Sequence, residues 1–217
     1  MIKPPYEIIK DFELALAAYT GAPYVCCVNS CTNALRLALD WQHRVIVNKH
    51  THVVEFIPEE FNITIPSRTY VSVPIQIKKA GFIPKFEEIE WSGVYRLKPH
   101  LIYDSARRFH SGMFKYANKT AYVCVSFHWT KILGLGHGGA ILHNDPDAVH
   151  FFREMRHDGR VEGMPIDNRH IQYLGDHCPM SPEIAAQGLV RLANLPKYND
   201  DLPNSDYPDL STFKVFK

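Results

Sequence analysis

The chain has 217 residues, of which 46% are hydrophobic and 22% are charged, which is the balance of an ordinary globular protein. Its 24 lysines and arginines against 23 aspartates and glutamates give a formal net charge of +1. This charge argues against nucleic acid as the main partner, because such proteins carry a strong positive field. Hydrophobic residues are too abundant for a disordered chain. The composition indicates one medium-sized folded domain.

The five cysteines are an odd number, two of them are adjacent, and several lie in apolar runs. This pattern is typical of reduced thiols and predicts a reducing compartment. No basic and then apolar leader opens the sequence, and no stretch approaches the roughly 18 to 20 apolar residues of a membrane helix. We therefore expect a cytoplasmic protein that does not insert into a membrane.

In chain order, the spacing of apolar residues predicts short strands that alternate with helices. The expected elements are a helix at 6–19, a strand at 24–28, a helix at 34–40, a strand at 61–66, a helix at 71–79, strands at 81–86, 100–104, 121–126 and 138–143, and helices at 145–156 and 181–195. The polar, proline-bearing tail after these elements is expected to wrap the surface or to reach a partner.

This alternation indicates an α/β fold with a mostly parallel sheet flanked by helices. We expect residues 1–195 to form one compact domain and residues 196–217 to form a C-terminal tail. In such sheets a ligand lies at the carboxyl ends of the strands. Polar residues follow several of the predicted strands, so the chemistry is expected at that edge.

Ser30, Cys31 and Thr32 follow the first predicted strand and open a helix. Unpaired backbone N–H groups and the helix dipole at such a start attract an anion, for which a phosphate is the natural candidate. The alternative is an ordinary helix cap, since serine and threonine are favoured there whatever the function. Taken alone, these residues favour the cap.

Two further residues at strand ends can carry chemistry. Asp104 ends an apolar strand and needs a cationic or N–H partner, because burying a carboxylate alone is costly; a helix-capping aspartate explains it equally well. Lys131 lies in a loop among aromatic residues and glycines, where partial desolvation would make its amine a nucleophile toward an aldehyde. The alternative is a solvated surface lysine, as most lysines are.

Together, a phosphate cradle, a carboxylate and a lysine are the three anchors that pyridoxal 5'-phosphate (PLP) requires. The cradle holds the phosphate, the carboxylate keeps the pyridine nitrogen protonated, and the lysine bonds the aldehyde. Tyr70 is placed to cover the ring. The sequence therefore predicts PLP as the cofactor.

The order of these motifs resembles the DegT/DnrJ/StrS family of sugar-nucleotide aminotransferases, which have the type I aspartate-aminotransferase fold. The resemblance runs from Phe12 to about Leu195. The similar segments are the family's phosphate turn at 28–35, the ring-stacking segment at 65–72, the aspartate stretch at 104–107, the lysine segment at 126–131 and the glycine loop at 136–139. A single match would be weak, whereas the ordered set is specific.

The resemblance implies a truncated type I large domain that works as an aminotransferase, with Lys131 and Asp104 catalytic. The residues that it implies for PLP binding are Ser30, Cys31, Thr32, Tyr70, Asp104, Arg107, Ser126, His128 and Lys131. It also implies glutamate or glutamine as the amino donor and a keto group on a nucleotide-linked sugar as the acceptor. A homodimer with a shared active site is expected as well.

Several features depart from the family pattern. Family members are longer, residues 90–100 replace a whole strand–helix unit, and most of the small domain is missing after residue 196. Cys31 stands for a glycine of the phosphate turn, Arg107 for a glutamine, and residues 176–179 for a stretch that often reaches the neighbouring subunit. Other functions therefore stay open: a second PLP chemistry such as dehydration, although related dehydratases carry histidine in place of the lysine; a non-catalytic remnant that binds cofactor or a partner; and a phosphate-binding module without PLP.

Residues 41–61 are an insertion relative to the family, and they contain His50, His52 and Glu55. Two histidines and one glutamate without a fixed geometry are weak evidence for a metal site. We expect a solvated loop there and no metal.

Overall fold

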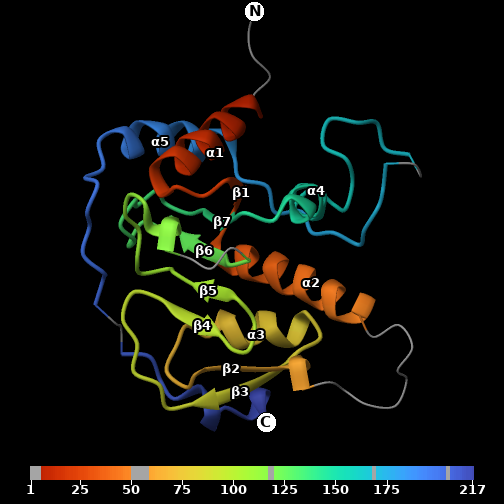
Figure 1. Ribbon diagram of the computed structural model, residues 1–217, viewed down its shortest axis with the longest axis vertical. Coiled ribbons are helices and arrows are strands. Elements are labelled where there is room, and N and C mark those ends of the chain that lie inside the picture. Colours follow the sequence, from red (N-terminus) through yellow and green to blue (C-terminus); the bar gives the residue numbers. More distant parts are fainter. Residues whose placement is uncertain (1–5, 50–58, 117–119, 168–169, 204–205) are drawn as a thin grey trace, which may run out of the picture.

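The computed structural model describes the chain except for residues 1–5, 50–58, 117–119, 168–169 and 204–205 (Figure 1). The helices are α1 (Glu7–Thr20), α2 (Cys31–Lys49), α3 (Ser72–Lys79), α4 (Pro146–Met155) and α5 (Pro182–Ala193), with short 3-10 turns at Glu59–Phe61, Met113–Tyr116, Leu210–Thr212 and Lys214–Phe216. The strands are β1 (Tyr24–Val28), β2 (Asn62–Pro66), β3 (Ile83–Glu87), β4 (Tyr95–Leu97), β5 (Ile102–Asp104), β6 (Tyr122–Ser126) and β7 (Gly139–His143).

Five strands form one sheet in the order β1-β7-β6-β5-β4, and β2 and β3 pair separately. The α/β class is confirmed, but the sheet is mixed, so the expectation of a mostly parallel sheet was wrong in that detail. Only β5–β6 is a parallel pair within the five-stranded sheet, and β2–β3 is the parallel pair outside it. The reason is that β7 runs antiparallel to both β1 and β6, to which a loop without a helix joins it, and that β4 runs antiparallel to β5.

The pairings nevertheless give β1, β5 and β6 the same direction. Their carboxyl ends therefore lie at one edge of the sheet, which is the edge where a ligand was expected.

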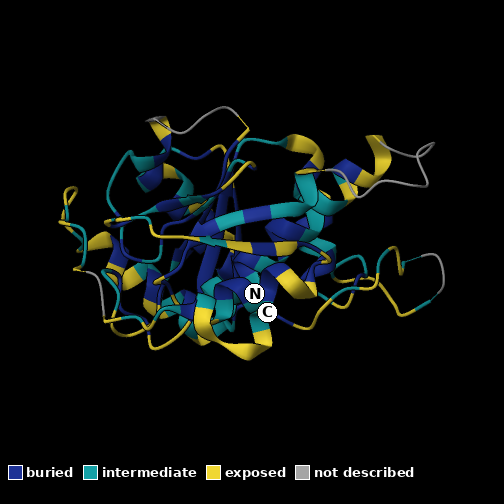
Figure 2. Ribbon diagram, turned by 90° about the horizontal axis from the view of Figure 1, so that it is seen from below, coloured by how far each residue is buried: buried dark blue, intermediate teal, exposed yellow. Residues whose placement is uncertain are grey.

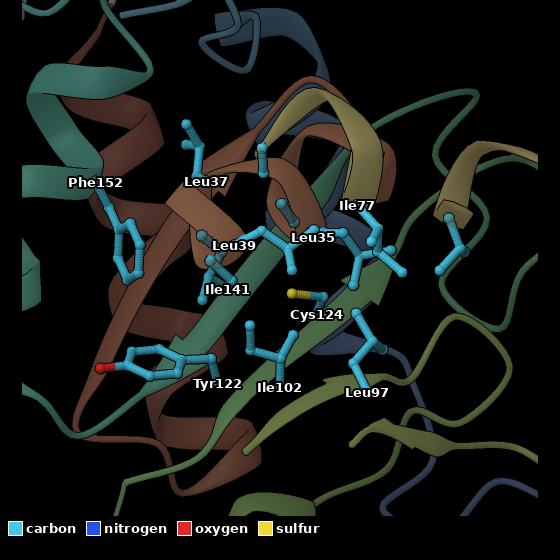
Figure 3. Packing of buried hydrophobic residues seen from close by; sticks show 14 of the residues in the cluster. Leu35, Leu37, Leu39, Ile77, Leu97, Ile102, Tyr122, Cys124, Ile141 and Phe152 are labelled. Atoms are coloured by element: carbon cyan, nitrogen blue, oxygen red, sulfur yellow. The ribbon is translucent and has the colours of Figure 1, made fainter. Parts of the chain in front are cut away.

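Helices cover both faces of the sheet, and strand residues alternate between two cores. In β6, Tyr122 and Cys124 belong to the core under α2, α3 and α4, which Figure 3 shows. Val123 and Val125 point to the other core, under the adjacent helices α1 and α5. Burial on both faces explains why these strands are continuous apolar runs.

Two elements differ from the sequence-based expectation. The helix expected at 34–40 runs on to Lys49, because its apolar stripe continues into residues read as an insertion: Ile46 is fully buried and Trp41 packs on Phe151 with ring centroids 5.1 Å apart. The strand β4 was not expected, because its three residues are too few to show a period. His50, His52 and Glu55 lie outside the described residues.

The C-terminal tail wraps the surface, which was one of the two outcomes expected for it. It leaves α5, passes the loop after β5 and ends against β3, where the rings of Phe86 and Phe216 lie 5.7 Å apart (Figure 1). Lys78 also donates to the Val215 carbonyl at 2.9 Å. Exposed residues gather at such peripheral segments, whereas the strands of the five-stranded sheet are mostly buried (Figure 2). Among the described residues no helix is long and apolar enough to cross a membrane.

A buried ion pair joins α1, β1 and the end of α4. Arg156 Nη1 lies 2.6 Å from Glu13 Oε1, and both side chains are nearly inaccessible. The same Arg156 nitrogen donates to the Cys27 carbonyl at 2.8 Å, and Glu13 accepts the Cys27 N–H at 2.8 Å. Removing one partner would leave the other charge buried and uncompensated.

We predict that Arg156→Met lowers the free energy of unfolding by about 3 kcal/mol or more, since breaking a buried pair typically costs that much. Urea denaturation followed by circular dichroism measures the change. Arg36→Met is the matched control, because Arg36 pairs with Asp40 within one helix at a partly exposed site, where a loss of only about 0.5 kcal/mol is expected. Equal losses in the two variants would contradict the structural importance of the buried pair.

Candidate active site

A cavity of about 410 Å³ lies at the carboxyl ends of β1, β5 and β6. All nine residues expected to bind the cofactor line it: Ser30, Cys31, Thr32, Tyr70, Asp104, Arg107, Ser126, His128 and Lys131. Their separation along the chain is large, and the shared direction of the three strands brings them together. Their roles remain predictions.

The first part of the site is the turn between β1 and α2. Ser30 accepts the Asn33 N–H on its hydroxyl at 3.2 Å, so it caps α2 and lines the cavity at the same time. Thr32 Oγ1 lies 3.0 Å from the hydroxyl of Ser72, the first residue of α3. The start of α2 thus presents two hydroxyls to one cavity, and a helix N-terminus is a setting that attracts an anion.

Gly139 lets β7 approach this turn very closely. A Cβ atom at residue 139 would lie 2.4 Å from the Cys31 nitrogen and 2.6 Å from the Ser30 carbonyl carbon.

Burial raises the pKa of the Cys31 thiol well above its usual value, and the neighbouring Asp104 raises it further. The thiol therefore stays neutral and adds no negative charge where an anion is expected.

Asp104 is buried at the end of β5, and each of its oxygens has one hydrogen-bond partner. Oδ1 accepts the Ala106 N–H at 3.0 Å and Oδ2 accepts the Tyr95 hydroxyl at 2.9 Å. Burial raises the pKa of the carboxyl above its usual value, while these two hydrogen bonds and the positive charges of Lys131 and Arg107 act in the opposite direction. A cation that entered the cavity beside Asp104 would stabilise the ionised form of this carboxylate.

Lys131 lies on the loop that joins β6 to β7. This loop is closed by backbone hydrogen bonds, from Phe127 to the Gly138 carbonyl at 2.9 Å and from Trp129 to the Gly136 carbonyl at 3.0 Å. The Lys131 N–H donates to the His128 carbonyl at 2.8 Å, so its backbone is fixed in a turn. Its half-buried side chain lines the cavity, which contradicts the alternative of a fully solvated lysine.

Ser126 and His128 flank the same loop. Ser126 accepts the His128 N–H on its hydroxyl at 3.4 Å, and His128 Nδ1 lies 2.9 Å from the Thr130 hydroxyl. Both side chains line the cavity, with His128 more exposed than Ser126. The polar lining of the cavity thus continues from the turn after β1 to the lysine loop.

Arg107 is buried and ties the cavity to the C-terminal tail. Its guanidinium donates to the Pro203 carbonyl and, at 3.3 Å, to the Tyr207 hydroxyl. It also lies over the Tyr207 ring, 5.6 Å from the centroid. This arginine therefore holds the tail against the site in addition to lining the cavity.

Sequence reasoning missed two aromatic residues of the cavity, Trp91 and Tyr207. Their rings lie 6.4 Å apart and are nearly parallel, with 13° between the planes. Tyr70, which was expected to cover a ring, is 56% exposed and has its ring 6.5 Å from that of Tyr207. No local pattern could reveal this contact, because Trp91 and Tyr207 lie in irregular segments far apart in the chain.

Among the described residues, no group of three or more histidine, cysteine or acidic side chains is arranged to hold a metal ion.

The model of the DegT/DnrJ/EryC1/StrS aminotransferase family matches residues 2–104 and 101–201. No protein in the curated set that was compared matches the sequence. Solved structures are similar in fold.

A proposed PLP-dependent aminotransferase from Bacillus cereus ATCC 10987 has a TM-score of 0.67 and 18% identity, over 88% of this chain and 59% of its own. A proposed sugar aminotransferase from Streptococcus pneumoniae, in its PMP form, has a TM-score of 0.63 and 20% identity, over 89% and 59%. The enzyme GDP-4-keto-6-deoxymannose-3-dehydratase (ColD), with bound GDP-perosamine, has a TM-score of 0.64 and 14% identity, over 87% and 61%.

The chain thus spans about 60% of the length of these proteins, and at such identities the likeness concerns the fold. The family match covers nearly all of the sequence and includes every residue of the cavity except Tyr207. This chain belongs to the DegT/DnrJ/EryC1/StrS aminotransferase family.

Proposed function

We propose that the protein is a PLP-dependent aminotransferase that moves an amino group from an amino-acid donor to a keto group of a sugar. The observation that carries the proposal is that a lysine amine, a buried carboxylate and a hydroxyl-rich helix start all line one cavity. An amine, a carboxylate and an anion cradle are the donor set that PLP needs, so the residues fit this cofactor.

The turn after β1 is proposed to hold the phosphate. Ser30, Thr32 and Ser126 would donate their hydroxyls, and the start of α2 would add backbone N–H groups and its dipole. A neutral Cys31 thiol and the absence of a side chain at Gly139 keep this cradle uncharged and open.

Asp104 is proposed to stabilise a protonated ring nitrogen. Its two existing hydrogen bonds, from Ala106 and Tyr95, fix the carboxylate in place and leave further lone pairs on both oxygens. Because burial disfavours the charge of an isolated carboxylate, a cationic partner in the cavity would be bound strongly.

Lys131 is proposed as the covalent anchor and the proton carrier. When bound, PLP supplies an electron sink that makes the hydrogen on the carbon beside the amino group acidic. The Lys131 amine, carried by a loop whose backbone is closed by hydrogen bonds, would take that proton and return it to a neighbouring carbon.

Family membership and the sugar enzymes among the structural neighbours support an amino donor and a sugar acceptor. Glutamate or glutamine as the donor, a nucleotide-linked acceptor, the homodimer with a shared active site and the cytoplasmic location remain part of the proposal, on the grounds of the family resemblance. The division into a PLP-binding domain at 1–195 and a tail also remains a prediction.

Two alternatives have specific observations in their favour. The neighbour ColD is a dehydratase, so the same fold supports loss of water in place of amino transfer. The departures from the family pattern at Cys31 and at Arg107, which is engaged by the tail, favour a non-catalytic protein that keeps the cavity for cofactor binding alone. A phosphate-binding module without PLP would not explain why Lys131 lines the same cavity as Asp104.

We predict that the protein with added PLP shows a visible absorption band that Lys131→Ala abolishes. Glutamate should bleach this band, because transfer of its amino group converts PLP to its amine form. Absorption spectroscopy, followed by borohydride reduction and mass mapping of the modified peptide, measures both effects. Lys85→Ala is the matched control, since Lys85 is exposed on β3 and lines no described cavity near the site.

The outcomes separate the candidate functions. A Lys131-dependent band that no amino donor bleaches would favour the non-catalytic protein. Complete absence of a band, with the fold intact by circular dichroism, would refute PLP binding and favour the phosphate module. Release of water without transfer of an amino group would favour the dehydratase.

We predict that Gly139→Ala raises the dissociation constant of PLP at least tenfold, or about 1.4 kcal/mol. The added Cβ would lie 2.4 Å from the Cys31 nitrogen, so β7 and the phosphate turn must move apart. An absorbance titration with PLP measures the change. Gly163→Ala is the control for lost backbone freedom, because Gly163 has a positive φ of 80° but open space around it. Unchanged affinity in Gly139→Ala would show that this turn does not hold the phosphate.

A further inference from the structure

We propose that Tyr95 is a positioning residue of the site, the middle member of a hydroxyl relay that begins at Thr69 and sets the orientation and the charge of the Asp104 carboxylate. The hydroxyl relay consists of the side chains of Thr69, Tyr95 and Asp104, in that order. The inference rests on the proposed function, in which Asp104 stabilises a protonated ring nitrogen, and it specifies how this chain keeps the carboxylate ionised and in place.

Tyr95 lies opposite Asp104 on the neighbouring strand. Tyr95 is the first residue of β4 and Asp104 is the last residue of β5, and the antiparallel register pairs the two. The Tyr95 hydroxyl donates to Asp104 Oδ2 at 2.9 Å and lies 2.7 Å from Thr69 Oγ1. All three residues are buried, with 1%, 7% and 6% of Thr69, Tyr95 and Asp104 exposed. Hydrogen bonds are stronger at such a site, because the local dielectric constant is low.

The charge of Asp104 decides which group donates along the hydroxyl relay. An ionised carboxylate can only accept, so the single hydrogen of the Tyr95 hydroxyl points to Asp104, and Thr69 then donates its hydrogen to Tyr95. A protonated carboxyl could donate to Tyr95 instead, and the direction would reverse. The hydrogen bond to the charged form is the stronger of the two, so the hydroxyl relay favours the ionised carboxylate.

Tyr95 lies behind the carboxylate and outside the cavity. Thr69 and Asp104 line the cofactor cavity, whereas Tyr95 does not. Burial and the charge of Asp104 raise the pKa of the Tyr95 hydroxyl well above its usual value, so the hydroxyl keeps its hydrogen near neutral pH. Its ring packs on that of Trp91, with centroids 4.7 Å apart, and the Trp91 indole N–H donates to the Arg68 carbonyl at 3.0 Å. Tyr95 is therefore a fixed donor that acts through Asp104.

The surroundings of Asp104 contain few other groups that could replace this donor. The titratable and charged groups that face the carboxyl are Lys131, Arg107, Cys31, Cys124 and Tyr95. The two cations lower its pKa through their charge, and burial keeps both thiols neutral. The Ala106 N–H holds Oδ1 at 3.0 Å, and Tyr95 holds Oδ2. Loss of the Tyr95 hydroxyl would thus remove the side-chain hydrogen bond of the carboxylate.

The hydroxyl relay also joins Asp104 to the segment expected to cover the cofactor ring. Thr69 directly precedes Tyr70, whose carbonyl accepts the Val73 N–H at 3.0 Å. A ring cation beside Asp104 would keep the carboxylate ionised and would thereby keep Thr69 in its role as donor. The group that holds the ring nitrogen and the segment that covers the ring would thus be fixed together.

The first test needs no cofactor. NMR titration of the full chain, labelled with ¹³C at the aspartate carboxyl carbons, measures the pKa of Asp104, and Asp104→Asn identifies its signal. We expect Tyr95→Phe to raise this pKa by about one unit or more, because the ionised form loses a charge-assisted hydrogen bond. Tyr122→Phe is the matched control: Tyr122 is also a buried strand tyrosine that donates to an aspartate, Asp145, at 2.5 Å, and its loss should leave the pKa of Asp104 unchanged.

The second test follows the pH dependence of PLP binding. A protonated ring nitrogen binds the ionised carboxylate, so the dissociation constant of PLP should rise as the pH falls through the pKa of Asp104 in the free protein. Tyr95→Phe should move this rise to higher pH by about one unit, and Tyr122→Phe should not move it. Absorbance titrations with PLP at successive pH values measure the change.

Thr69→Val decides the question if Tyr95→Phe does not fold. It removes the first donor of the hydroxyl relay with little change of shape, and it should raise the pKa of Asp104 by a smaller amount in the same direction. An unchanged pKa of Asp104 in the folded Tyr95→Phe variant, or in Thr69→Val where the former is unfolded, would overturn the inference. So would equal rises in Tyr95→Phe and Tyr122→Phe, because a general loss of packing would then explain both.

Failure of this inference is distinguishable from failure of the proposed function. If the pKa of Asp104 responds to Tyr95→Phe but no Lys131-dependent band forms with PLP, the aminotransferase proposal fails and the hydroxyl relay stands. If the band forms and glutamate bleaches it, but neither the pKa nor the pH dependence of binding responds to Tyr95→Phe, the function stands and the hydroxyl relay is refuted.

Discussion

The site depends on one constraint, the common direction of β1, β5 and β6 within a mixed sheet. Each strand delivers a polar residue at its carboxyl end: Ser30 just after β1, Asp104 at the end of β5 and Ser126 at the end of β6. The antiparallel β7 lies between β1 and β6, and it reaches the phosphate turn only because Gly139 has no side chain. Apolar burial on both faces of the sheet holds these ends at fixed separations.

The tail contributes what the sheet alone lacks. The chain spans about 60% of the length of its structural neighbours, and Tyr207 of the tail lines the cofactor cavity together with residues between 30 and 138. Arg107 links the two parts, because it lies at the carboxyl end of β5 and donates to the tail at Pro203 and Tyr207. Arg107, which departs from the family pattern, thus contacts two residues that lie beyond the family match.

Much of the fold followed from the sequence because the strands and helices have strong, local periods. The apolar runs of β1 and β6 and the caps of α4 and α5 are visible in a few residues each. The candidate site followed from an ordered set of motifs and from the family resemblance. The mixed sheet, the strand β4 and the contact between Trp91 and Tyr207 did not, because each depends on segments that are far apart in the chain. The helix α2 was underestimated because its last turns read as an inserted loop.

The position of Tyr207 in the chain has a consequence for the order of assembly. Every other lining residue of the cofactor cavity lies between Ser30 and Gly138, so these parts leave the ribosome first. Tyr207 is therefore the last lining residue of the cavity to be synthesised. Until then Trp91 and Tyr70 are the tryptophan and tyrosine side chains of the lining, and the groups at Pro203 and Tyr207 that accept from Arg107 have not yet been made.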